Sequence, residues 1–291
     1  MERELLSRTY KHGAYRSFAV NDTKRREIAV ASIKDRFIHR LLYEHLVKIY
    51  DKTFIYDVWS CREGKGLLGA IERAQDFLAK NPNGFFWRSD VRKFFDSVDH
   101  QTLLDILIRR IKDTKTMWLL KEVIDSYTTN ASVWSAERER ERAIESPRGI
   151  AIGNVTSQIF SNIYLNEFDR YVKHVLHIKK YLRYGDDFVI FTNNRDEAVE
   201  HRKLMQTFLH DKLSLTLHAR NDVIFPCSKG LKFLGCMLYP THRCLQKRVW
   251  YRVLTHTDRY NISSYSGLVH AHCEAEMMKY FHWSTLKFLD E

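Results

Sequence analysis

Two short apolar runs near the middle of the chain predict buried β-strands, and each run adjoins carboxylates. Residues 85–91 form the first run, which carries Asp90 close to its end. The second run directly follows Gly185, Asp186 and Asp187, and a short aromatic segment precedes these three residues. Gly185 stands where a tight turn between two strands needs a glycine. The pattern therefore predicts a hairpin with two adjacent carboxylates at its tip.

Apolar side chains recur at helical spacing in three longer stretches. Asp99 is placed to cap the first helix, whose apolar positions are Leu103, Leu104, Leu107, Ile108 and Ile111. A second helix begins near Asp35, and its predicted buried stripe comprises Phe37, Ile38, Leu41, Leu42, His45, Leu46 and Ile49. The third follows the turn-rich segment 149–154, with a predicted stripe of Val155, Ile159, Phe160, Ile163, Phe168, Tyr171, Val172 and Val175.

The remaining elements are short. Residues 15–20 and 27–31 predict two strands, joined by a basic turn at 21–26 that reaches a phosphorylated ligand or simply lies in solvent. Residues 231–238 predict a strand pair with a glycine at its bend. The tail from 247 to 291 predicts two or three short helices. The expected fold class is therefore α+β.

Composition limits the partners more than the fold. The 291 residues suffice for one catalytic unit with subdomains, and 44% of them are hydrophobic. Lys and Arg number 47 against 36 Asp and Glu, which gives a net charge of +11 and favours a polyanionic partner such as a nucleic acid. A merely soluble basic protein is the alternative. The alternating glutamates and arginines of 136–142 predict a solvated insertion without a function.

Five cysteines without paired spacing, and a polar N-terminus without a signal peptide, predict a reducing, cytoplasmic location. The histidine- and cysteine-containing segments 242–244 and 270–273 lack the C-x-x-C spacing of structural zinc sites, so zinc binding is not expected there. No segment approaches the ~20 apolar residues of a membrane span, and no membrane partner is expected.

The carboxylates carry the predicted chemistry. Asp90, Asp186 and Asp187 supply the hard oxygen ligands that a pair of Mg²⁺ ions takes from a protein. Two such ions activate an attacking 3′-hydroxyl and stabilise a leaving pyrophosphate. A solvated acidic turn is the alternative for the Gly-Asp-Asp hairpin alone, but it does not account for the strand that brings Asp90.

From Tyr15 to about Pro240 the chain resembles reverse transcriptases. Blocks typical of that family occur in the expected order, and together they are far more specific than any one of them. These blocks are the basic hairpin with Lys24 and Arg26, Asp35-Arg36, Cys61 to Gly66, the Asp90 block, the helix from Gly153 to Phe168, the hairpin from Tyr184 to Phe188, and Leu231 to Gly235.

The resemblance implies a right-hand polymerase with fingers, a palm containing a small antiparallel sheet, and a short helical thumb. Residues 1–60 would form the N-terminal part of the fingers. Residues 61–245 would form the palm, with an inserted helical fingers segment at about 103–148. Residues 246–291 would form the thumb. The segment before Tyr15 and the tail are both short for the family, which predicts either a compact variant or a truncated reading frame.

The resemblance also implies roles for individual residues. The Val91 carbonyl would join the three carboxylates as a metal ligand, with Mn²⁺ able to replace Mg²⁺. Nucleotide binding would involve Lys24 and Arg26 at the triphosphate, Phe95 at the sugar, and Ile152, Gly153 and Gln158 around the base. The primer grip would comprise Phe233, Leu234 and Gly235. The proton donor to pyrophosphate stays open between His218 and Arg220.

Within the family, the sequence from Ile152 to Gln158 is most similar to the enzymes of diversity-generating retroelements. Most reverse transcriptases have a glutamine at the position of Ile152. The implied partners are an RNA template, a DNA or RNA primer, dNTPs and a small basic accessory protein, in a bacterial, archaeal or phage-encoded system. These relatives copy RNA with frequent errors at adenines. Because isoleucine offers no side-chain hydrogen bond, we hypothesise that Ile152 loosens base selection.

Three alternatives remain. Viral RNA-dependent RNA polymerases share the Gly-Asp-Asp hairpin, but they have an aspartate where this chain has Phe95, whose ring would exclude a 2′-hydroxyl. Other bacterial reverse transcriptases come from retrons, group II introns or phage-defence systems, and Ile152 argues against the first two. A catalytically dead polymerase fold that only binds RNA would not require all three carboxylates. Gly185 departs from the family, which usually has a bulkier residue there.

Overall fold

The computed structural model describes residues 1–21, 25–129 and 147–286. Three small antiparallel sheets organise it. The first pairs β1 (Arg16–Asn21) with β2 (Arg25–Val30). The second has the order β4-β5-β3-β6, with bounds Tyr181–Tyr184, Asp187–Thr192, Phe85–Asp90 and Val223–Pro226. The third has the order β7-β8-β9, with bounds Leu231–Phe233, Cys236–Leu238 and Arg243–Leu245. The predicted α+β class is confirmed.

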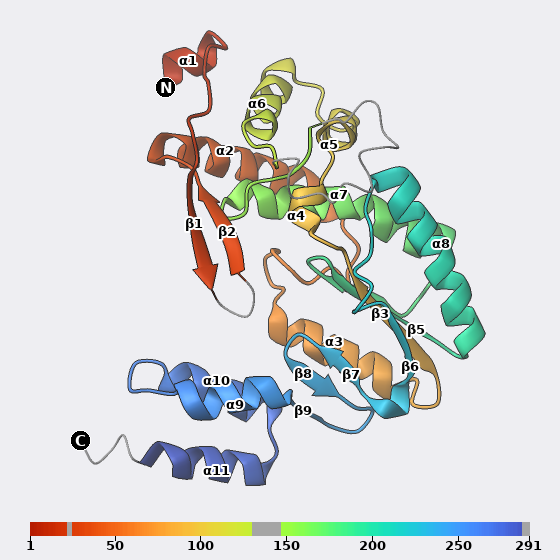
Figure 1. Ribbon diagram of the computed structural model, residues 1–291. Helices are drawn as coiled ribbons and strands as arrows, with labels where there is room; N and C mark the ends of the chain where they lie inside the picture. The colour runs from red at the N-terminus through yellow and green to blue at the C-terminus, as the bar shows by residue number, and fades with distance from the viewer. Residues whose placement is uncertain (22–24, 130–146, 287–291) are drawn as a thin grey trace.

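Helices surround these sheets. Those that precede the β4–β5 hairpin are α1 (Glu2–Leu6), α2 (Ile33–Tyr50), α3 (Leu67–Ala79), α4 (Phe94–Ser97), α5 (His100–Ile108), α6 (Thr114–Asp125) and α7 (Val155–Arg170), which a π-helical turn at Tyr171–Val175 continues. Those that follow are α8 (Arg195–Leu213), α9 (Lys247–His256), α10 (Ile262–His272) and α11 (Ala275–Thr285). Figure 1 shows the β1–β2 hairpin at the upper left of the molecule and helices α9–α11 below it at the lower left. The predicted domain boundaries remain predictions.

The four-stranded sheet lies between two apolar layers because successive side chains of a strand point to opposite faces. Trp87 of β3 packs with Phe188 and with residues of α7 and α8 in one hydrophobic cluster. Phe86 packs with Val189, α3 and the third sheet in the other cluster. Arg88 and Asp90 follow Phe86 at intervals of two, so they lie on the same face as Phe86.

Side-chain caps begin the predicted helices. The Asp99 carboxylate accepts a hydrogen bond from the Thr102 backbone N–H at 2.8 Å, which confirms the predicted cap of α5. The Ser32 hydroxyl caps α2 by accepting a hydrogen bond from the Asp35 N–H. The helix therefore begins at Ile33, two residues before its predicted start near Asp35. The expected helical tail is confirmed as α9, α10 and α11.

The predicted face of α2 was wrong in part. Phe37 and Leu41 are 65% and 54% exposed and His45 is exposed as well, whereas the polar residues Asp35 and His39 are buried. The helix is rotated toward α7, because the His39 ring pairs with the Thr156 hydroxyl and Asp35 accepts hydrogen bonds from nearby residues. Hydrogen bonding therefore decided which face of α2 is buried, and the spacing of apolar residues along the sequence could not predict it.

Two further predictions have other outcomes. Val175 was assigned to the buried stripe of α7, but it is 62% exposed because the helix changes to π-helical winding over its last turn. The expected insertion at 136–142 lies outside the residues that the structure describes.

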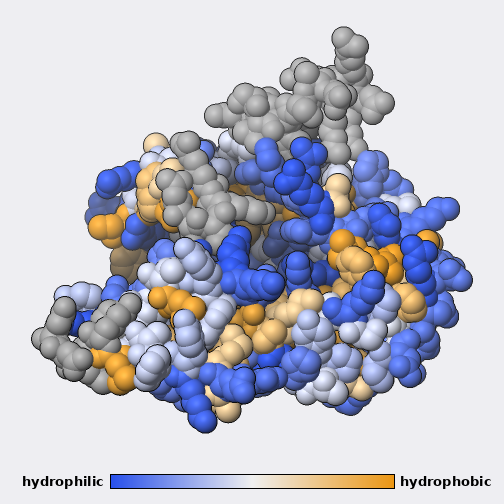
Figure 2. Space-filling model, turned by 60° about the horizontal axis from the view of Figure 1, so that its bottom comes forward, coloured by the Kyte–Doolittle hydropathy of each residue, from blue (hydrophilic) through white to orange (hydrophobic). Residues whose placement is uncertain are grey.

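The face of the molecule in Figure 2 is mostly hydrophilic, with its apolar side chains in separate patches. None of the described helices is both long and apolar enough to cross a membrane.

Candidate active site

The antiparallel pairing of β3 with β5 brings the predicted carboxylates together. Asp90, the last residue of β3, is the register partner of Asp187, the first residue of β5. Asp186 precedes Asp187 in the tight turn from β4. All three therefore lie at one end of the central sheet, as the sequence predicted.

Burial and neighbouring negative charge raise the pKa of Asp186 and of Asp187. The pKa of Asp186 is raised to about 6, first by burial and then by the negative charges of Asp187 and Asp90. Burial also raises the pKa of Asp187, and the neighbouring Arg88 opposes that rise. Carboxylates that repel one another at the end of a buried sheet form a local excess of negative charge, which a cation would relieve.

Arg88 supplies one such cation from within the protein. Its Nε donates to Asp187 Oδ1 at 2.9 Å and its Nη2 to Asp187 Oδ2 at 2.6 Å, a two-pronged ion pair. Arg88 precedes Asp90 by two residues in β3, so the same face of the strand presents both. The sequence analysis missed this residue, although the period of two along the strand contained the signal.

Asp90 is positioned from the loop that precedes β6. The Asn221 side-chain amide donates to Asp90 Oδ2 at 2.8 Å, and the His218 backbone N–H donates to the Asp90 carbonyl at 2.9 Å. Asp90 Oδ1 is buried and has no hydrogen-bond partner. Asn221 directly follows Arg220, the second of the two candidate proton donors after His218, and was itself not predicted.

The oxygen atoms of this site are of the chemical kind that binds a divalent cation. Three carboxylates converge, one buried oxygen of Asp90 lacks a partner, and Val91 is buried beside them through a bridge to Leu217. Within the described ranges, no three His, Cys, Asp or Glu side chains are already grouped closely enough to hold a metal ion. Arg88 engages both oxygens of Asp187 in this structure.

The hairpin that carries Asp186 is anchored by a guanidinium with no access to solvent. Arg183 of β4 and Asp169 of α7 are both fully buried, and Arg183 Nη2 donates to Asp169 Oδ2 at 2.6 Å. Arg183 Nη1 also donates to the Asn162 side chain and to the carbonyl of Gly185, at 3.2 and 2.8 Å. The turn is therefore tied directly to α7, and no sequence pattern indicated this network.

Gly185 has the positive φ of 65° that tight turns require, which confirms the predicted role of this glycine in the turn. Its N–H donates to the Ser60 hydroxyl at 2.8 Å. No atom lies within 4 Å of where a Cβ would stand. The space beside Gly185 is therefore open, and only the backbone conformation disfavours the bulkier residue that the family usually has there.

The predicted nucleotide-binding residues come from neighbouring segments. The Phe95 carbonyl accepts from the Ile150 N–H at 2.8 Å, and the Ile152 carbonyl accepts from Ala29 of β2 at 2.8 Å. Phe95 and Ile152 are half-buried, while Gln158 and Arg26 are exposed. Lys24 lies outside the described residues.

Close packing against β2 explains why residue 153 is a glycine. Its φ is +112°, and an added Cβ would stand 2.7 Å from Ile28 Cγ2 on β2. The following residue, Asn154, donates to the Ala29 carbonyl at 2.8 Å. Gly153 therefore allows the β1–β2 hairpin to lie directly on this turn. The Ser157 hydroxyl donates to the Ala151 carbonyl in the same turn, so its contact is internal.

The predicted primer-grip residues form the β7–β8 turn. Leu234 and Gly235 have positive φ angles of 47° and 86°, as a two-residue hairpin turn requires. Phe233 is fully buried beneath this turn, and the Gly235 carbonyl accepts from Gln246 at the start of α9. Leu234 and Gly235 thus form a half-buried tip, and their contact with a primer remains a prediction. All five cysteines are free.

Comparison with known proteins identifies the family. Residues 11–238 match the family model described as reverse transcriptase (RNA-dependent DNA polymerase). Protein YkfC of Escherichia coli is 25% identical over 85% of this chain and 71% of its own length. The group II intron-encoded protein LtrA of Lactococcus lactis subsp. cremoris is 21% identical over 74% of this chain and 44% of its own length.

Two solved structures support the fold. The telomerase of Candida albicans, in complex with a fragment of telomeric RNA, superposes with a TM-score of 0.58 and 10% identity over 97% of this chain. Apo telomerase of Candida tropicalis superposes with a TM-score of 0.59 and 12% identity over 96%. This chain spans 55% and 57% of those two chains. At such low identity the likeness establishes the fold alone, and it agrees with the predicted right-hand polymerase.

The buried Arg183–Asp169 ion pair generates the first prediction. Asp169→Ala should lower the free energy of unfolding by about 3–5 kcal/mol, because it leaves a buried guanidinium without its counter-charge. Glu167→Ala is the matched control on the same helix. It removes a surface ion pair with Arg109, whose side chain is 61% exposed, and should cost at most ~1 kcal/mol. Urea unfolding measures both, and equal losses would refute the anchoring role.

The raised pKa of Asp186 generates a second prediction. The folded state retains this proton up to about pH 6, so without a cation the protein loses stability as pH rises from about 4 to 6. Mg²⁺ should therefore raise Tm more at pH 7.5 than at pH 5. Asp186→Asn should remove this difference, whereas Asp105→Asn on the exposed face of α5 should preserve it. A Mg²⁺-induced shift that is independent of pH would contradict the assignment.

Proposed function

This chain belongs to the reverse transcriptase family, and we propose that it is an RNA-directed DNA polymerase that extends a DNA or RNA primer on an RNA template with dNTPs. The convergence of Asp90, Asp186 and Asp187 at the end of the central sheet carries the proposal. These residues lie within the segment that matches the family model.

Asp90, Asp186, Asp187 and the Val91 carbonyl would hold two Mg²⁺ ions, or Mn²⁺ in their place. When bound, such ions supply an activated 3′-oxygen and stabilise the departing pyrophosphate. Arg88 opposes the rise in the pKa of Asp187 and orients its carboxylate, and Asn221 fixes one oxygen of Asp90 so that the other stays available. The protein thus contributes a preorganised set of negative charges to the reaction.

Phe95 would select the sugar. Its ring is half-buried and packs edge-to-face on Phe94, with ring centroids 5.5 Å apart, and its backbone is bonded to Ile150. A ring that packs on its neighbour and stands on a hydrogen-bonded backbone does not easily swing aside for a 2′-hydroxyl. Arg26 and Lys24 would meet the triphosphate, and the β1–β2 hairpin that carries Arg26 packs on the turn at Gly153.

Nucleic-acid binding is supported by the net charge of the chain and by the exposed side chains of α9 and α11, the helices that follow the proposed primer-grip turn in the sequence. Helix α9 exposes Lys247, Arg248 and Tyr251, and its neighbour α11 exposes Trp283. Cationic side chains meet phosphates and aromatic side chains stack on bases, in the combination that such surfaces use. The overall charge of +11 acts in the same direction.

For the biological setting, we propose the diversity-generating retroelement class, with a small basic accessory protein as partner. Ile152, at the position where most reverse transcriptases have glutamine, supports it. An intron-encoded enzyme is the second candidate, because LtrA is among the similar proteins. The two differ in fidelity, so the spectrum of copying errors separates them.

Primer extension on a defined RNA template tests the activity. With Mg²⁺ and all four dNTPs, the wild-type protein should extend the primer, and Asp187→Asn should lower the rate by at least about a hundredfold, since it weakens a metal ligand without changing its shape. Asp105→Asn should retain full activity. Comparable extension by Asp187→Asn and the control would refute the metal assignment.

Phe95→Ala should admit ribonucleotides, because it removes the ring that would collide with the 2′-hydroxyl. The measurement is the ratio of kcat/KM for dNTP and rNTP, which should fall by about tenfold or more, a difference of about 1.4 kcal/mol. Phe54→Ala is unsuitable as a control because Phe54 is a core residue. Phe37→Ala removes an exposed ring on α2, outside the proposed sites, and should leave the ratio unchanged. Continued rejection of ribonucleotides would remove Phe95 from this role.

Ile152→Gln tests the fidelity hypothesis. A glutamine amide restores side-chain hydrogen bonds near the incoming base, so misincorporation opposite template adenine should fall by about tenfold. Sequencing of extension products measures the error spectrum. Ile28→Gln, on the neighbouring strand β2, controls for the addition of an amide nearby. An error spectrum that Ile152→Gln leaves unchanged would sink the hypothesis, and accurate copying by the wild type would favour the intron-type setting.

A further inference from the structure

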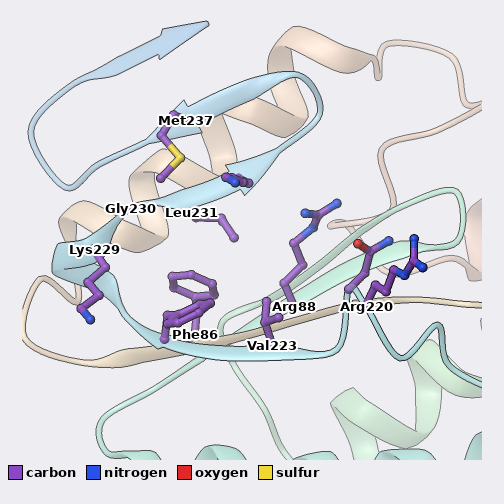
Figure 3. A pocket seen from close by; sticks show the side chains of 11 residues that line it. Phe86, Arg88, Arg220, Val223, Lys229, Gly230, Leu231 and Met237 are labelled. Atoms are coloured by element: carbon purple, nitrogen blue, oxygen red, sulfur yellow. The ribbon is translucent and has the colours of Figure 1, made fainter. Parts of the chain in front are cut away.

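A cavity of about 410 Å³ lies between the central sheet and the β7–β8 strands, next to the carboxylates. Figure 3 shows Lys229 at one end, Arg88 and Arg220 together at the other, and Phe86 between them. The volume falls within the ~300–1,000 Å³ range of small-molecule sites. None of the roles assigned above uses this cavity as a binding site.

Four cationic side chains line the cavity, and only Arg88 among them is paired with a carboxylate, that of Asp187. Arg88, Arg220, Lys229 and Lys232 contribute to its wall, and no aspartate or glutamate does. Across the described part of the chain, Arg220, Lys229 and Lys232 form no ion pair with a carboxylate. Three exposed cations around one hollow favour an anion, and the side-chain amide of Asn221 adds a hydrogen-bond donor at the same wall.

The floor of the cavity is apolar and partly aromatic. Phe86 of β3 and Phe225 of β6 lie side by side, with ring centroids 6.3 Å apart, and Phe225 is 44% exposed. Val223, Leu231 and Met237 complete the apolar surface. An exposed ring on a rigid strand offers a stacking platform to a nucleobase, and inorganic anions alone would gain nothing from it.

We propose that this cavity binds a nucleoside 5′-phosphate, with the phosphate at Arg88, Arg220 and Asn221 and the base on Phe225. The choice of a nucleotide over other aromatic anions rests on the proposed polymerase function. The ligand is a free nucleotide or one nucleotide of a single strand, since both present the same chemistry. Arg88 also holds Asp187, so one guanidinium connects this cavity with the candidate active site.

Isothermal titration in EDTA tests the proposal, because chelation prevents nucleotide binding through divalent cations at the carboxylates. The probes are dAMP, deoxyadenosine, inorganic phosphate and a six-residue oligodeoxyadenylate. Wild-type protein should bind dAMP at one site, and more tightly than either deoxyadenosine or phosphate. The double variant Arg220→Gln/Lys229→Gln should weaken that binding by at least about tenfold.

The matched control is Arg195→Gln/Lys203→Gln, which removes the same two charges from the exposed surface of α8, on the other face of the sheet. It should bind dAMP as the wild type does. Binding of the oligonucleotide but not dAMP, lost only in the cavity variant, would also support the site and assign its ligand to a strand. Absence of binding by both probes, or equal effects of the two double variants, would overturn the proposal. Because no polymerisation occurs in EDTA, failure of the polymerase assignment is scored separately by primer extension.

Discussion

The ion pair between Arg183 and Asp169 is the contact on which the geometry of the site depends. Both groups are inaccessible to solvent, so neither tolerates the loss of the other. Arg183 sits in the strand that leads into the acidic turn, and its remaining donors bind the turn itself and α7. Tyr181 adds a hydroxyl donor to Asp169. The turn is thereby held as part of the core rather than as a surface loop.

Rigid support is needed here because the groups it presents repel one another. Asp186 and Asp187 are adjacent in sequence, and the register of β3 against β5 places Asp90 beside them. Burial and mutual repulsion raise the pKa of Asp186 and of Asp187. In a flexible loop such carboxylates would separate. The anchored hairpin keeps them together, and Arg88 offsets part of the cost from within the same strand.

Three side chains with different proposed roles lie along β3, on the same face of the central sheet. Phe86, Arg88 and Asp90 follow one another at intervals of two in β3, so they run from the apolar floor of the basic cavity, through the shared guanidinium, to the carboxylate end. The β1–β2 hairpin approaches the opposite side of the site across Gly153, which lacks the Cβ that would block it. The basic cavity, the three carboxylates and the β7–β8 turn thus come within one region of the molecule.

The sequence by itself determined the elements and the carboxylates. Alternation and helical spacing predicted the two strands that carry them, the Asp99 cap, the glycine turns and the helical tail, because these depend on local backbone preferences. Only the tertiary structure decided which face of α2 is buried, that Arg88 holds Asp187, that Asn221 holds Asp90, and that Arg183 is buried against Asp169. Each of these depends on a partner from a different element, at a distance and orientation that no local pattern encodes.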